Sequence, residues 1–430
     1  MGCAPPGPAS RHYAERLQAV ECPAFQRRRA RRAPGDDESW PIVLAAGQGS
    51  DLRDVDDHRY VDLAAGFGSV ILGHGHPAVT EAIAGQLSRL AQGLGDVYAT
   101  DTKLELLEQL SALHPAGPAQ VLLGQSGSDA VTAALKTATL ATGRHGFVAF
   151  DGAYHGLGYG PLPACGFQAG FRTPFAPQLN PEVHHAPYPG VRGADEDAAL
   201  TFLRQLLRAE RVAAVLVEPV LGRGGCITPP DSFLAELCTL AHRHGALVIA
   251  DEIWTGLGRC GSWLRSEAIH LPVDILCLGK GLGGGLPISA CIAPPALMAG
   301  WAQDGEAIHT STHSGAPLAC AAALATLKTL RDETLVERSH SLGTKARQVF
   351  REQLSSCDSV RDVRGEGLMI GIQLPDGATA QRACAALLER GYLVLTGDVS
   401  GATLTLTPAL TIPERKLLGF GQCLREILQR

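Results

Sequence analysis

The sequence predicts an α/β protein, in which a large domain with a mainly parallel central sheet is joined to a smaller α+β domain. Two observations support this fold class. Short, almost wholly apolar runs recur through the middle of the chain, at 121–123, 147–150, 212–217, 246–250, 275–278 and 290–293. Helical patterns separate several of these runs, at 129–141, 195–209 and 231–244. Apolar strands without alternation, interleaved with amphipathic helices, are typical of a parallel sheet that helices cover on both faces.

The flanking segments predict the smaller domain. Residues 51–63 carry the turn residues of a small hairpin. Helical patterns that begin at Pro77 and at Lys103 follow it and precede the apolar runs of the large domain. Beyond residue 310 the expected elements are an Ala-rich helix, a longer helical region and short strands, at 317–330, up to 354, at 367–374 and at 392–396.

These patterns divide the chain into three segments. We expect an N-terminal arm and part of the small domain in 1–75, the large domain in 76–310, and the C-terminal part of the small domain in 311–430. Residues 1–40 are polar and irregular in pattern, and their basic run at 27–32 is expected to be a solvated arm or helix face.

Composition excludes several classes of protein. The chain has 430 residues, 45% of them apolar and 19% charged, which is enough apolar material for a large core and argues against disorder. A net charge of −6 argues against a nucleic-acid binder, and no run is long and apolar enough to span a membrane. The twelve cysteines lie mostly in apolar runs without a C-x-x-C pair, so we expect reduced thiols, a cytoplasmic location and no zinc site.

Chemically active residues follow the predicted strands directly. Asp251 ends one apolar run, Glu218 follows another, and Lys280 follows a third within the glycine-rich stretch GKGLGGG. Ligands of open parallel sheets bind beyond the carboxyl ends of the strands. We therefore expect these side chains to meet at one site.

The segment Ser126-Gly127-Ser128 precedes a predicted helix and is a candidate phosphate cradle. Small residues let backbone N–H groups approach a ligand, and a helix N-terminus supplies unpaired N–H groups and a positive dipole end. The alternative is an ordinary serine N-cap, which the triplet alone does not exclude.

Lys280 differs from the other five lysines, which all lie in helical patterns. Behind a buried strand, its charged form is destabilised, so a neutral nucleophilic amine becomes accessible. The alternative is a structural salt bridge to Asp251 or Glu218. Asp251 needs a cationic or hydrogen-bonding partner, which a protonated pyridine nitrogen would provide, and Tyr154 could cover a cofactor face or simply pack. Together these groups describe a site for pyridoxal 5′-phosphate (PLP).

Six stretches, in order along the chain, resemble the class III, or omega, aminotransferases, which are PLP enzymes of fold type I. They are SGSDAVTAALKTA (126–138), FDGAYHG (150–156), EPVLGRGGCITPP (218–230), DEIWTGLGRCG (251–261), DILCLGKGLGGGLPISA (274–290) and HTSTHSGAPLACAAALA (309–325). The resemblance implies a PLP-binding large domain and a homodimer with active sites at the subunit interface.

The resemblance also implies roles for individual residues. Lys280 would be the internal-aldimine lysine and proton shuttle, and Asp251 would hold the pyridinium nitrogen. The remaining implied site residues are the phosphate ligands Gly127 and Ser128, Tyr154 stacked on the ring with His155 beside it, Ile253 on the opposite ring face, Thr312 reaching the neighbouring subunit's phosphate, and the active-site glutamate Glu218.

The implied reaction is a two-stage, ping-pong transfer of an amino group. The donor is a primary amine or ω-amino acid, or an amino sugar-like metabolite, and the acceptor is an oxo acid or aldehyde. One alternative uses the same cofactor for epimerisation, racemisation or aminomutation. Another is a non-catalytic binding module, which an intact Lys280 and Asp251 argue against.

Two positions depart from the family pattern. Trp254 stands where many members have a glutamine that touches the cofactor's ring oxygen, and Thr405 stands where an arginine commonly clamps a substrate carboxylate. A hydroxyl cannot replace a bidentate guanidinium. We expect Arg259 and Arg364 to be structural, and Arg223 is an open candidate for the missing clamp.

Overall fold

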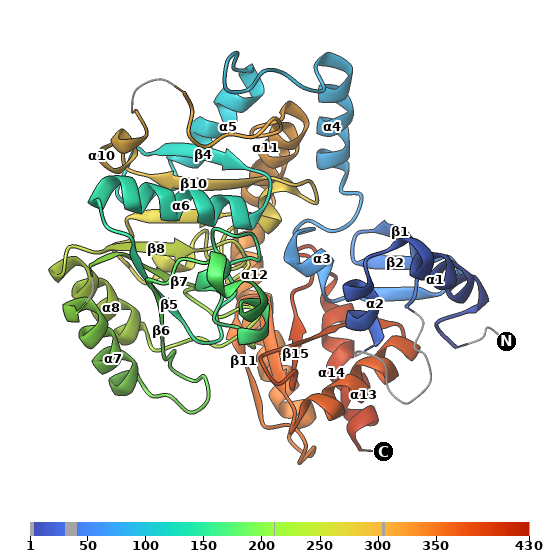
Figure 1. Cartoon of the computed structure of the whole chain (residues 1–430). Helices are drawn as coiled ribbons and strands as arrows, with labels where there is room; N and C mark the ends of the chain where they lie inside the picture. The colour runs from blue at the N-terminus through green and yellow to red at the C-terminus, as the bar shows by residue number, and fades with distance from the viewer. Residues whose placement is uncertain (1–3, 31–40, 210, 303–305, 430) are drawn as a thin grey trace.

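The computed structural model describes residues 4–30, 41–209, 211–302 and 306–429 of the chain. Among these residues, seven strands form the central sheet in the order β4-β10-β9-β8-β7-β5-β6 (Figure 1). Its strands are β4 (Gln120–Gly124), β5 (Gly146–Phe150), β6 (Val183–Ala186), β7 (Val212–Val217), β8 (Leu247–Asp251), β9 (Ile275–Leu278) and β10 (Ser289–Ala293).

The central sheet is mainly parallel, as the apolar runs predicted. Strand β10 is antiparallel to both of its neighbours, so β4 still runs in the same direction as the other strands. The edge strand β6, which includes two histidines, was not predicted because it is short and lacks an apolar run.

Both faces of this sheet are buried, which explains why its strands are apolar throughout. In β8, Ile249 belongs to one core cluster, whereas Val248 and Ala250 belong to the other. Helix α6 (Gly127–Thr142) packs on the first face, and α8 (Asp231–Arg243) packs on β8. The remaining helices of this part are α4 (Pro77–Arg89), α5 (Asp101–Ser111), α7 (Glu196–Ala209), α9 (Arg265–Ala268), α10 (Pro295–Met298) and α11 (Pro317–Asp332).

The two ends of the chain meet in a second, smaller α+β region (Figure 1). One sheet has the order β1-β2-β3-β13, in which β13 (Tyr392–Leu393) pairs in parallel with β3 (Arg59–Asp62). The predicted hairpin is β2 (Asp51–Asp54) with β3, and β1 (Leu44–Gln48) adds to it. The second sheet contains β11 (Asp362–Glu366), β12 (Met369–Gln373), β15 (Thr403–Leu406) and β14 (Leu395–Gly397), in that order.

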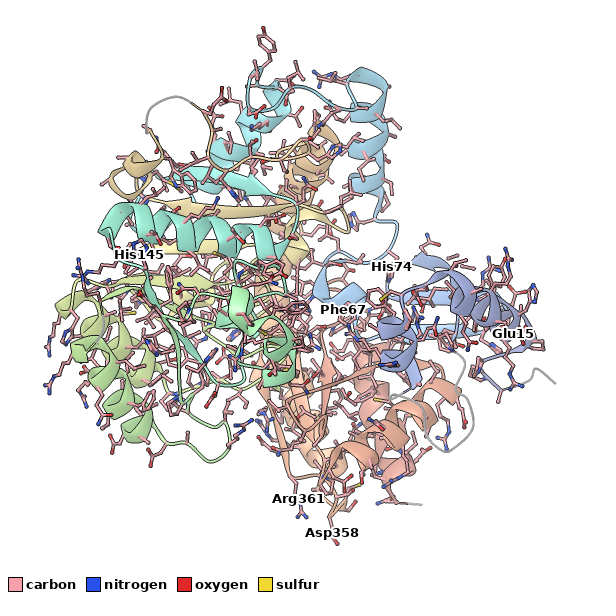
Figure 2. All side chains as sticks on the ribbon, in the orientation of Figure 1. Glu15, Phe67, His74, His145, Asp358 and Arg361 are labelled. Carbon is pink, nitrogen blue, oxygen red and sulfur yellow. The ribbon has the colours of Figure 1, made fainter. Side chains whose placement is uncertain are left out.

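Helices α12 (Leu335–Leu354), α13 (Gly377–Glu389) and α14 (Glu414–Leu428) pack beside these two sheets. The short helix α3 (Ala65–Gly68) connects the hairpin to the large domain. Its residue Phe67 lies at the junction of the two regions in Figure 2, and its side chain is half exposed.

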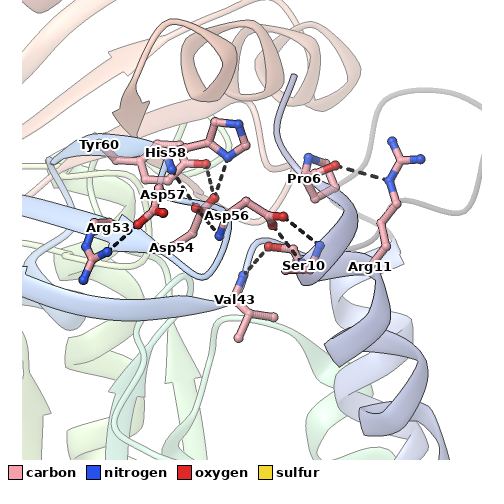
Figure 3. A network of polar contacts seen from close by, with 11 residues as sticks. Pro6, Ser10, Arg11, Val43, Arg53, Asp54, Asp56, Asp57, His58 and Tyr60 are labelled. Carbon is pink, nitrogen blue, oxygen red and sulfur yellow. Dashed lines mark hydrogen bonds and ion pairs between the residues drawn. The ribbon is translucent and has the colours of Figure 1, made fainter. Parts of the chain in front are cut away.

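The N-terminal segment, irregular in sequence pattern, contains two helices, and part of its basic run lies on the second of them, which has no buried residue, in agreement with the expected solvated arm or helix face. Helices α1 (Pro8–Val20) and α2 (Pro23–Ala30) occupy much of it, and Arg31 and Arg32 of the basic run lie outside the described residues. The carboxylate of Asp56, in the hairpin turn, accepts hydrogen bonds from the amides of Ala9 (2.7 Å) and Ser10 (2.8 Å) (Figure 3). This cap comes from a residue 46 positions away, and the local start signals are limited to Pro8 at the first helical position after Gly7.

Cysteine chemistry agrees with the expectation of reduced thiols. The eleven cysteines among the described residues are all free, and eight of them are buried. No described helix has the length and apolar character that a membrane crossing requires.

Candidate active site

The carboxyl ends of β4, β8 and β9 bring the predicted residues to one edge of the central sheet. Ile253, two residues beyond β8, is in contact with the loops that follow the other two strands. A methyl group added to Gly127 would lie 3.0 Å from Ile253 Cδ1, and one added to Gly279 would lie 3.3 Å from its Cγ2. Ile253 therefore lies between the serine-glycine segment and the strand end that carries Lys280.

The N-terminus of α6 has free hydrogen-bond donors. Ser126 is its N-cap: the Ser126 Oγ accepts from the Asp129 amide (3.3 Å), and the Asp129 carboxylate accepts from the Ser126 amide (3.0 Å). The amides of Gly127 and Ser128 donate no hydrogen bond within the described part of the chain. Ser126 is therefore an ordinary serine N-cap, which was the alternative for this triplet. The amides of Gly127 and Ser128 remain free and suit an anion.

Lys280 has the environment expected of a reactive amine. It begins a short 3₁₀ turn (Lys280–Gly283) with φ +40°, a left-handed conformation that is strained for a lysine. Burial lowers the pKa of Lys280, Asp251 and Glu218 oppose that shift, and the charge of Arg223 adds to it. The alternative salt bridge does not form: among the described residues, Lys280 has no carboxylate within ion-pair distance, and its Nζ lies 4.5 Å from the centroid of the Trp254 ring.

Asp251 is 4% exposed and is held in one orientation. Its Oδ2 lies 2.7 Å from His155 Nδ1, and its Oδ1 accepts from the Ile253 amide at 3.1 Å. The second ring nitrogen of His155, Nε2, is buried without a partner in the described structure. The sequence placed His155 beside Tyr154 but did not reveal its pairing with Asp251, because that contact joins the ends of two strands 96 residues apart.

Glu218 connects two loops of the site. Its Oε1 accepts from the Tyr154 amide (2.7 Å), and its Oε2 accepts from the Gly222 amide (3.1 Å). Burial raises the pKa of Glu218 to about 7; nearby His155 opposes this shift, and Asp251 adds to it. The side chain therefore positions the backbone that carries Tyr154 and the residue after Gly222.

That following residue, Arg223, is a site residue whose surroundings the sequence did not predict. Its guanidinium carbon lies 4.4 Å from the ring centroid of Tyr154 and 4.6 Å from that of Phe167. Trp254 fills the space between Gly68 and Gly222, because a methyl group on either glycine would overlap the indole ring.

Thr312 is exposed and lies near the α6 N-terminus rather than in the cluster around Lys280. Its carbonyl accepts from Gln92 Nε2 (2.6 Å), and the hydroxyl of its neighbour Ser311 accepts from Gln125 Nε2 (2.5 Å). Since Gln125 directly precedes Ser126, the segment of Thr312 borders the candidate phosphate cradle.

The model of the protein family described as aminotransferase class-III matches residues 33–428, which is nearly the whole chain. The chain belongs to the class III aminotransferases. Its cofactor is therefore pyridoxal phosphate and its activity is amino transfer, which agrees with the expected fold type I and not with the alternative of a non-catalytic module.

Curated relatives carry related names. The chain is 37% identical to an acetylornithine aminotransferase of Methanopyrus kandleri, over 88% of this chain and 92% of that protein. It is 33% identical to the 5-aminovalerate aminotransferase DavT of Pseudomonas aeruginosa, over 91% and 95%. Among solved structures, a PLP-bound amine transaminase from an uncultivated Pseudomonas species superimposes with a TM-score of 0.84 at 31% identity, covering 91% of this chain and 95% of that one.

The residues of this aminotransferase fit PLP. The two free amides at the start of α6 suit a phosphate, the buried carboxylate of Asp251 suits a protonated ring nitrogen, and the amine of Lys280 has no competing ion pair. The family and the relatives above also favour amino transfer over racemisation or epimerisation.

Arg259 and Arg364 have structural partners, as expected. Arg259 Nη1 donates to the carbonyls of Leu368 (3.1 Å) and Pro408 (2.6 Å), and Arg364 Nε donates to the carbonyl of Gly225 (2.8 Å). Arg364 is thus occupied by structural partners, whereas Arg259, which is 1% exposed, has Nε and Nη2 buried without a partner in the described structure.

Proposed function

We propose that this aminotransferase moves an amino group between a primary amine or ω-amino acid and an oxo acid or aldehyde. The observation that carries the proposal is the amine of Lys280, which lies among Asp251, Glu218 and Trp254 without an ion pair and with a lowered pKa. Relatives named for acetylornithine and for 5-aminovalerate support a donor whose reacting amine is at the end of a carbon chain.

The chain's own residues would divide the work as follows. Bound PLP supplies an electron sink for the charge that develops when the substrate loses a proton. The Lys280 Nζ, whose pKa burial lowers, takes that proton and later returns it. Asp251 holds the proton on the ring nitrogen, and His155 orients Asp251.

The other site residues would bind and orient the cofactor. The amides of Gly127 and Ser128 and the Ser128 hydroxyl bind the phosphate, with Ser126 capping the helix beside them. Tyr154 would cover one face of the cofactor ring and Ile253 the other. Ile253 is in contact with the loops of Gly127 and Gly279.

A second copy of this chain would complete the site. The segment 87–104 exposes large apolar side chains, namely Leu87, Leu90, Leu94, Val97, Tyr98 and Leu104. It is joined to the Thr312 segment by the bond from Gln92 and by one from Thr310 Oγ1 to Asp96 (3.0 Å). An exposed apolar surface beside Thr312 supports a homodimer in which Thr312 reaches the partner's phosphate.

The remaining parts of the proposal concern location and domains. Free, largely buried cysteines support a cytoplasmic enzyme of small molecules. The proposed segments are 1–75, 76–310 and 311–430, and α11, just inside the third, packs against α4 and α5.

A Lys280→Ala variant tests the function. Reduction of the PLP-loaded protein with borohydride is expected to leave the cofactor covalently bound to the peptide that contains Lys280, and to leave none in the variant. Amino transfer from 5-aminovalerate is expected to require an oxo-acid acceptor and to be lost in the variant. Attachment at another lysine, or conversion that needs no acceptor, would overturn the proposal. Lys328→Ala, on the surface of α11, is the matched control.

A further inference from the structure

Arg223 is a half-buried cation with no acidic partner. Among the described residues, no carboxylate lies within ion-pair or hydrogen-bond distance of its guanidinium. Burial lowers the pKa of Arg223, and the nearby charge of Arg28 acts in the same direction. A buried charge without a partner is unfavourable, so such a group in an enzyme site points to an anion that arrives with the ligand.

An aromatic cage holds this guanidinium. The rings of Tyr154, Phe167 and Phe171 have their centroids 4.4, 4.6 and 5.6 Å from its central carbon. Aromatic faces stabilise a cation without using its N–H groups. The Tyr154 hydroxyl is close enough to accept from one of them, and the other N–H groups stay available for an anion.

The cage is next to the reacting centre. Tyr154 and Gly222, on the two loops that contribute to it, both donate their amides to the carboxylate of Glu218. The charge of Arg223 is also close enough to act on Lys280, whose pKa it lowers. The guanidinium is thus next to the face of the site formed by Tyr154, whereas the free amides that suit a phosphate are at the start of α6.

Arg223 is attached to the wall that carries Thr405. Its carbonyl accepts from the Asp398 amide (2.9 Å), directly after β14, and the carbonyl of Gly225 accepts from Arg364 on β11. Strand β14 pairs with β15, in which Thr405 is 5% exposed. The backbone of Arg223 is therefore anchored beside the strand pair that has a hydroxyl instead of an arginine at position 405.

We propose that Arg223 binds the carboxylate of the substrate, so that the site selects amino acids and oxo acids over amines and aldehydes that lack a carboxylate. This inference rests on the proposed function for the reaction, and it assigns specificity to a residue outside the position that the family commonly uses.

The test compares wild type with Arg223→Gln, Arg223→Met and Arg223→Lys, all loaded with PLP. Arg223→Met keeps an apolar stem in the cage, and the circular dichroism spectrum and melting temperature check folding. Kinetics with 5-aminovalerate are compared with those of pentylamine, which has the same chain length and no carboxylate. Binding of glutarate, a non-reacting dicarboxylate, is measured by calorimetry. Arg204→Gln, a partly exposed arginine on α7, is the control.

We expect the Gln and Met variants to lose roughly 10–100-fold in kcat/KM for 5-aminovalerate and in glutarate affinity, with a change of about 2-fold or less for pentylamine. Arg223→Lys, which keeps a point charge but not the bidentate edge, should fall between. Equal losses for both donors, or unchanged glutarate binding, would overturn the role of Arg223. If wild type transfers nothing from either donor, the proposed function fails, and glutarate binding still decides the inference about Arg223.

Discussion

Glu218 shows how one buried carboxyl group links the site to the pH dependence of stability. Its pKa is raised from an ordinary 4.5 to about 7, chiefly by burial, so the folded protein retains a proton that the unfolded chain has already released. The stability that this group contributes is complete below pH 4.5 and is lost as the pH rises through 7.

We therefore predict that Glu218→Gln flattens this dependence. Between about pH 4.5 and pH 7.5, wild type should lose about 3 kcal/mol more unfolding free energy than the variant, measured by urea denaturation of cofactor-free protein. Glu236→Gln, a partly exposed glutamate on α8, should behave like wild type. Parallel curves for wild type and Glu218→Gln would show that Glu218 is already ionised at low pH.

Asp251 is expected to determine both kcat and the affinity of the enzyme for PLP. Asp251→Asn removes the negative charge beside the ring nitrogen, and kcat should fall by about 10²–10³-fold, the loss typical of a preorganised electrostatic group. PLP affinity, measured by fluorescence titration, should fall as well. Asp332→Asn, in a surface ion pair with Lys328, is the control. Unchanged kcat in Asp251→Asn would remove Asp251 from the mechanism.

The residues named from the sequence and their contacts were not equally predictable. Lys280, Asp251 and Glu218 could be named because each follows an apolar run. The pairing of Asp251 with His155, and the cage around Arg223, could not be predicted, because each contact joins segments that are distant in sequence.

At the scale of elements, the N-terminus of α6 separates two serines with different roles. Ser126 caps the helix through its hydroxyl, whereas Ser128 Oγ has a long contact of 3.4 Å with the Gly158 amide. The same three-residue motif therefore serves stability at one end and, as proposed, phosphate binding at the other.

We predict that Ser126→Ala lowers the unfolding free energy of the cofactor-free protein by about 1 kcal/mol, because a helix cap is lost. Ser128→Ala should change stability little and should weaken PLP binding, measured by equilibrium dialysis. Each variant is the control for the other. Two variants with the same stability and the same PLP affinity would contradict this division of roles.

The elements that sequence patterns missed share a physical cause. Strand β6 pairs in parallel with β5 at the sheet edge, and α1 is capped by Asp56 from the distant hairpin turn. In both, the stabilising partner comes from another part of the chain, so the local pattern is weak.

At the scale of the whole molecule, the exposed apolar segment 87–104 indicates an interface with a second copy. We predict that Leu94→Glu in this segment shifts the protein toward monomer, as measured by light scattering after gel filtration, and lowers PLP affinity because Thr312 of the partner is withdrawn. Phe202→Glu, at an exposed apolar position on α7, is the control. A Leu94→Glu dimer with full PLP affinity would exclude this surface as the interface.

The sequence by itself determined the fold class and named the residues that we propose carry the chemistry, because apolar runs and the polar residues that end them are local signals. The tertiary structure decided the partnerships: the capping role of Ser126, the orientation of Asp251 by His155, and the cage around Arg223. Such contacts depend on which strand ends and loops come together in the folded chain, and the residues that meet are tens to hundreds of positions apart in the sequence.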